Sequence, residues 1–108
     1  MKTLAEYQIL GYVGQITEAG PTLKVRLAAD YGRRNDKGDW DSKSFWNTVT
    51  IFNENVVKWA KENIEKGDFV HARGTIRETS YDKDGETIYG VTLAADQFSL
   101  LAKKTDQR

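Results

Sequence analysis

One segment with helical spacing interrupts a chain that is otherwise patterned as strands. In residues 53–68, Val57, Ala60 and Ile64 recur on one helix face, an Asn or Glu residue precedes the first turn, and Gly67 can end the helix. We expect a helix of roughly three turns there. The chain on both sides of it is patterned as strands, so the sequence indicates a β fold with a lone helix.

The strand segments are rich in β-branched and aromatic residues and are separated by turn-forming ones. They predict strands at residues 7–16, 22–29, 45–52, 69–79 and 88–102. Residues 80–87 contain an Asp-Gly turn signature. Residues 30–44 are polar and long for a hairpin connection, so they are either an extension of the strands or a functional loop. The element order predicts an all-β OB-fold, a five-stranded partly open barrel with one helix between strands 3 and 4.

Length and composition exclude several classes of protein. A chain of 108 residues makes one domain, which we place at residues 1–102, with 103–108 as a short flexible tail. Its composition, 39% hydrophobic and 30% charged, is typical of a soluble protein. No apolar run could span a membrane and the start lacks a secretory signal, so we expect a cytoplasmic, nucleoid-associated protein with no membrane contact.

Few residues here can support chemistry. The chain has no cysteine and a single histidine, so we expect no metal and no cofactor. No motif places a nucleophile or carboxylate beside His71, and no glycine-rich phosphate loop precedes a helix. We therefore expect a binding protein without a catalytic residue.

The third strand has large apolar side chains on both faces. Phe45, Val49 and Ile51 fall on one face, and Trp46 and Phe52 on the other. Only one face can line a barrel. The other packs under a loop or a partner subunit, or it is a platform on which nucleobases stack for about 1–3 kcal/mol each.

Basic residues on neighbouring strands favour the platform. Lys24 and Arg26 point outward from the second strand, as do Arg73 and Arg77 from the fourth, and a single strand of nucleic acid needs cations beside rings. The overall charge argues mildly against this, because 16 basic and 16 acidic residues cancel. Any binding face must be locally basic, and residues 22–52 carry a small basic excess.

Four segments together resemble a known family. They are ILGYVG, WNTVTIF, IEKGDFVHARGTIR and SYDKDGETIYGVTLAADQFSLL. In this order and spacing, from about Gln8 to Leu101, they are similar to the bacterial single-stranded DNA-binding protein family. The resemblance implies binding of single-stranded DNA with little sequence specificity, protecting it during replication, recombination and repair.

The resemblance also implies a set of DNA-binding residues. Trp46 and Phe52 stand where the family stacks bases, and Tyr81 where it commonly has a tryptophan. Tyr31 and Trp40 could also stack, although Trp40 could equally fold onto its own hairpin. The implied phosphate contacts are Lys24, Arg26, Arg33, Arg34, Lys37, Arg73 and Arg77.

Partners follow from the same resemblance. It implies a homotetramer, or alternatively a dimer, built in part on the first strand. Asn47 and Thr48 stand where the family often has histidine and arginine, so the subunit contact could differ. The chain stops at KKTDQR, without the family's usual acidic tip, so if it is complete the recruitment of replication and repair proteins is missing. Two alternatives remain open: an OB-type protein-interaction or primosomal accessory module, and an RNA-binding OB domain.

Overall fold

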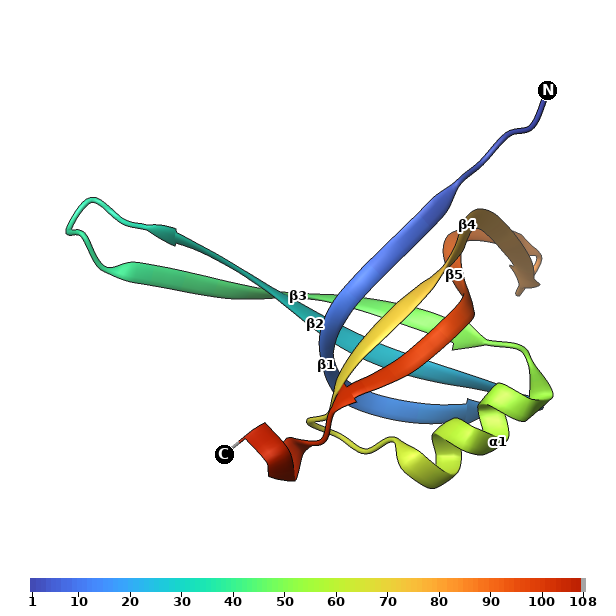
Figure 1. Ribbon diagram of the computed structural model, residues 1–108. Helices are drawn as coiled ribbons and strands as arrows, with labels where there is room; N and C mark the ends of the chain where they lie inside the picture. Colours follow the sequence, from blue (N-terminus) through green and yellow to red (C-terminus); the bar gives the residue numbers. More distant parts are fainter. Residues whose placement is uncertain (108) are drawn as a thin grey trace.

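The computed structural model describes residues 1–107 as a closed barrel with strand order β1-β2-β3-β5-β4. Neighbouring strands are antiparallel except β3 and β5, which run parallel at Val49–Ile51. Figure 1 shows the helix beneath the barrel and two long hairpins that leave it in different directions. The elements are β1 Glu6–Ala19, β2 Thr22–Arg34, β3 Trp40–Ile51, α1 Glu54–Asn63, β4 Phe69–Lys83, β5 Glu86–Ala102 and the 3-10 helix η1 Lys104–Gln107. The expected order of five strands and one helix is confirmed, and the three pairs between β3 and β5 close the barrel that we expected to be partly open.

Both hairpins are longer than the sequence suggested. β2 and β3 stay paired from Leu23 with Ile51 out to Arg34 with Trp40, so residues 30–44 extend the strands and only residues 35–39 turn. β4 and β5 stay paired up to a two-residue turn at Asp84 and Gly85, where residues 80–87 were expected to turn. Outside the barrel both faces of a hairpin meet water, so the polar sequence there does not mark a loop. We call the projecting part of β2 and β3 the arm.

The core lies between the inward faces of the strands and α1. Its largest fully buried apolar side chains are Leu23, Val25, Leu27, Val49, Ile51 and Val70. β4 also comes close to β5 at Gly74, where an added Cβ would lie 1.7 Å from the carbonyl oxygen of Ala94. No other residue type fits there without a shift of the backbone.

The helix has the predicted length of about three turns, but it does not end at Gly67. Asn53 caps its start by accepting hydrogen bonds from two backbone amides, as an N-cap asparagine does. The helix stops at Asn63, because Ile64 takes an extended backbone that turns its side chain into the core, while its amide still bonds to Ala60. Gly67, with φ +95°, lies in the following loop and is not the helix stop. In residues 1–107, no helix is both long enough and apolar enough to cross a membrane.

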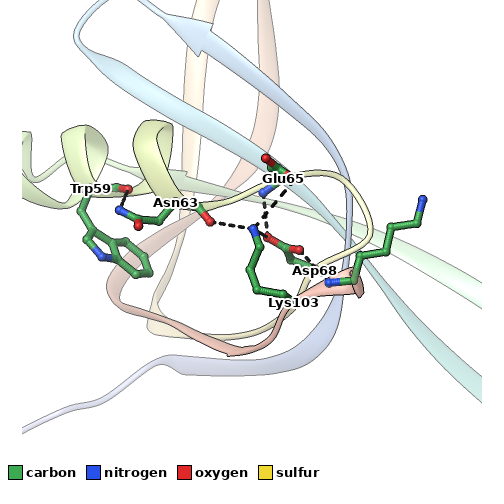
Figure 2. A network of polar contacts seen from close by, with 6 residues as sticks. Trp59, Asn63, Glu65, Asp68 and Lys103 are labelled. Carbon is green, nitrogen blue, oxygen red and sulfur yellow. Dashed lines mark hydrogen bonds and ion pairs between the residues drawn. The ribbon is translucent and has the colours of Figure 1, made fainter. Parts of the chain in front are cut away.

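A buried carboxylate ties the loop after α1 to the end of β5 (Figure 2). Asp68 is fully buried and accepts hydrogen bonds from Lys103 Nζ at 2.7 Å and from the backbone amides of Glu65 and Lys104 at 2.8 and 3.0 Å. Burial alone would raise the pKa of Asp68, but these donors and the charge of Lys103 together lower the pKa below its ordinary value. The barrel therefore holds the chain beyond residue 102, where we expected a flexible tail to begin. Residue 108 lies outside the described residues.

Candidate nucleic-acid interface

Three aromatic side chains lie along the outer side of β3. Trp40, Trp46 and Phe52 are spaced six residues apart, so they share one side of the strand and its continuation, roughly 20 Å from one to the next. Their exposed fractions are 67%, 45% and 55%. We call this side of β2 and β3, from Phe52 at the barrel to Trp40 on the arm, the outer face.

Trp46 is held on the outer face by a glycine and an arginine. β1 has an irregular register at Gly14, and a Cβ there would lie 2.2 Å from the Trp46 ring. Trp46 pairs with Ala28 of β2, so its ring reaches across β2 to β1. The Arg26 guanidinium lies 4.4 Å from the ring centroid, a cation–π contact. The Trp46 ring therefore has a defined position against Gly14 and a cation beside it.

Basic side chains of β2 and β4 lie on or beside the outer face. Arg26 pairs with Thr48, and Arg77 of β4 pairs with Thr92 of β5. Thr48 and Thr92 directly precede Val49 and Leu93, which are partners in the parallel β3–β5 pair, so the two threonines are also neighbours. One row of side chains therefore crosses β2, β3, β5 and β4 in the order Arg26, Thr48, Thr92 and Arg77. Lys24 lies one step along β2, opposite Thr50. The outer face is locally basic around Trp46, although the whole chain is neutral.

The arm carries a second tryptophan. Trp40 lies on Gly32 of the paired strand, where a Cβ would be 2.3 Å from the indole. Trp40 thus rests on its own hairpin and still has 67% of its surface exposed. Arg34 pairs with Trp40, and Lys37 is exposed in the turn between the strands.

Four of the residues that we expected to bind DNA lie away from the outer face. Arg73 is on β4 but outside the row described above, and its guanidinium pairs with Glu6 of β1 at 3.2 Å. Tyr81 is near the tip of the β4–β5 hairpin, which projects away from the arm (Figure 1). Tyr31 and Arg33 point to the opposite side of the arm from the two tryptophans, because they alternate with Arg34 along β2. The structure does not bring these four together with Trp46.

Sequence reasoning missed Thr92 and Gly14. Both are defined by contacts between strands far apart in the chain, and neither carries a local pattern that would mark it. In residues 1–107, no three His, Asp or Glu side chains are grouped to hold a metal ion.

The closed five-stranded barrel with its helix between β3 and β4 is an OB-fold. Residues 9–101 match the single-strand binding protein family, and the chain belongs to that family. Binding of single-stranded DNA is accordingly its activity.

Individual relatives agree with the family. The chain is 26% identical over 114 residues to single-stranded DNA-binding protein 1 of Xylella fastidiosa, an alignment that covers 98% of this chain and 83% of that protein. Its fold is similar to that of the Plasmodium falciparum SSB in complex with ssDNA, with a TM-score of 0.71, 17% identity and coverage of 95% and 97%. It is also similar to the mitochondrial protein Rim1 of Saccharomyces cerevisiae, with a TM-score of 0.67, 22% identity and coverage of 94% and 98%.

Proposed function

We propose that the outer face is where this protein binds single-stranded DNA. The observation that carries the proposal is the alignment of Trp40, Trp46 and Phe52 on one face, with Lys24 and Arg26 beside them. Bases stack on the rings and the cations contact phosphates, which gives affinity with little sequence preference. The protein would then cover single strands exposed in replication, recombination and repair, in the cytoplasm at the nucleoid.

This arrangement selects single strands over duplex. The rings can only contact the face of a base, and in a duplex the base faces are already covered by their neighbours. The preference for single strands therefore follows from the exposed rings and not from charge, because duplex DNA carries the denser phosphate charge.

Titration with defined oligonucleotides tests the function. We expect oligo-dT to quench the intrinsic tryptophan fluorescence strongly and duplex DNA to have little effect. We expect about four phosphate contacts, so the slope of log K against log salt should be shallow, with a magnitude of about 3 or less. An equal response to oligo-U would favour the RNA-binding alternative. No response to either oligonucleotide would contradict the proposal and favour a protein-interaction module.

A glycine variant tests the seat of Trp46. Gly14→Ala should push the indole off its position, because the new Cβ would overlap the ring at 2.2 Å. We expect the affinity for oligo-dT to fall severalfold, less than on removal of the ring. Gly90→Ala is the matched control, since nothing lies within 4 Å of an added Cβ there. Equal affinities of the two variants, measured by anisotropy of a labelled oligonucleotide, would contradict this position for the ring.

We propose that self-association uses the outer side of β1 and β4 together with the end of β5, next to the outer face. Leu10, Tyr12 and Leu101 are each about half exposed there, and Tyr12 packs on Phe69 with ring centroids 4.9 Å apart. Exposed apolar side chains grouped in this way are typical of a subunit interface. They support the proposal of a homotetramer, or alternatively a dimer, built in part on β1.

A further inference from the structure

The single histidine of the chain lies on the surface that we propose for self-association. His71 is on the outward side of β4, between its partners Leu10 of β1 and Ser99 of β5. The next outward pair along the same two strands, Tyr12 with Phe69, is in ring contact. We call the surface formed by Leu10, Tyr12, Phe69, His71 and Leu101 the association surface. His71 is therefore a titratable group within a patch of apolar side chains.

The imidazole of His71 has a neutral hydrogen-bond partner. Its Nε2 atom lies 2.7 Å from Oε1 of Gln8 on β1, and the ring donates to this amide oxygen. A neutral imidazole can supply the proton for that bond. Protonation adds a second N–H group and a positive charge, and the Gln8 amide has no charge to offset it. The protomer thus satisfies the neutral form of the ring better than the charged form.

The charged groups around His71 do not offset a positive ring either. Arg73 lies two residues along β4 on the same side, roughly 7 Å away. The carboxylates of Glu6 on β1 and Asp96 on β5 lie further along the strands than Arg73. Glu6 pairs with Arg73 at 3.2 Å, and Asp96 lines the same small pocket. Tyr12 is the other titratable group of the association surface, and a phenol gains no charge in mild acid.

We propose that His71 makes the self-association of this protein sensitive to pH, so that subunits separate as its ring gains a proton. The inference rests on the proposed self-association, because it needs a second copy to cover the association surface. In a twofold contact the same patch meets itself, so apolar side chains or the other His71 face each ring. An imidazolium loses its hydration there without gaining a counter-ion. Histidine changes charge between about pH 8 and 5, so the protein assembles near neutral pH and dissociates in mild acid.

Measurement of mass at two pH values tests the inference. On the full chain, light scattering over a range of concentrations should show the dissociation constant rising about tenfold or more between about pH 7.5 and 5.5, where histidine gains its proton. His71→Gln stays neutral and keeps an amide beside Gln8, so its dissociation constant should be the same at both pH values. His71→Lys is charged at both, so it should associate more weakly than the wild type at about pH 7.5.

A thermal melt at the lower pH separates dissociation from unfolding. His71 is only half-buried and lies outside the core, so the wild type and His71→Gln should both keep a cooperative transition there. Loss of that transition in the wild type alone would mean that acid unfolds the barrel, and it would overturn the inference.

Other results would also overturn the inference. A wild-type oligomer with one dissociation constant at both pH values would mean that the contact tolerates a charged His71. An unchanged pH dependence in His71→Gln would assign the effect to other groups. A monomer at both pH values would remove the association surface as well. The proposed DNA binding fails separately, because it is measured by the response of the wild type to oligo-dT.

Discussion

Replacing Lys103 with methionine is expected to lower the free energy of unfolding by about 3 kcal/mol. Methionine has a similar length but no charge, so the fully buried carboxylate of Asp68 loses its ammonium partner at 2.7 Å. Breaking a buried ion pair from one side costs about 3–5 kcal/mol, since the remaining charge stays desolvated. We place the loss at the lower end of this range because the Lys103 side chain is 32% exposed and water can partly replace it.

The same variant should change how stability depends on pH. The pKa of Asp68 is lower in the folded protein than in the unfolded chain. Its contribution to stability is therefore complete above the unfolded pKa of about 3.9 and is lost as the pH falls through the folded pKa. Without Lys103 the folded pKa rises, so the loss of stability on acidification begins at a higher pH.

Urea unfolding at several pH values measures both effects. Lys66→Met is a suitable control, because it removes one lysine charge from an exposed position in the loop that contains Asp68. We expect the control to change stability by less than about 0.5 kcal/mol. If Lys103→Met unfolds like the control, then the ion pair in Figure 2 contributes nothing measurable.

The buried pair also lies close to the backbone beneath Trp46, on the face proposed to bind DNA. The loop that Asp68 anchors pairs with β1: the Val13 amide donates to the Asp68 carbonyl at 2.9 Å, and the Gly67 amide donates to the Val13 carbonyl at 2.8 Å. Gly14, the seat of the Trp46 ring, is the next residue of β1. The contacts that Lys103 and Lys104 make with Asp68, just after β5, thus stabilise the part of β1 that lies under the Trp46 ring.

The sequence predicts the parts of this fold that have a local pattern. The alternation along β3 separates Val49 and Ile51 from Trp46 correctly, and the helical spacing of Val57 and Ala60 locates α1. Alternation could not tell where the barrel ends, because Phe45 continues the core face of β3 into solvent. That is why the pattern could not show that Phe45 lies outside the barrel.

Long-range contacts are the part of the structure that no local sequence pattern predicts. Asp68 and Lys103 are separated by 35 residues, and nothing in either neighbourhood indicates that one is buried against the other. The contact between Gly14 and Trp46 is of the same kind, since it depends on a bulge in β1 and on the register of β2. The resemblance to the family predicts Trp46 as a stacking residue, but only the barrel shows that the ring lies against Gly14.

Replacing Trp46 with alanine is expected to weaken binding of oligo-dT by about 1–3 kcal/mol, roughly 5- to 150-fold in Kd. The indole supplies the stacking surface nearest to the row of Arg26 and Arg77, so its loss removes one base contact and releases the guanidinium that rests on it. The salt dependence should change little, because the cations remain. Stacking and phosphate contact are thereby measured separately.

Anisotropy of a labelled oligo-dT gives the Kd without relying on the fluorescence of the remaining tryptophans. Trp59→Ala is the matched control: it removes an indole that is 36% exposed, on α1 instead of the outer face. We expect the control to bind nearly as the wild type does. Because Trp46 lies at the centre of the aligned rings, a wild-type Kd for Trp46→Ala would move the binding path off the outer face. The β4–β5 hairpin, which carries Tyr81, would then be the next surface to test for DNA binding.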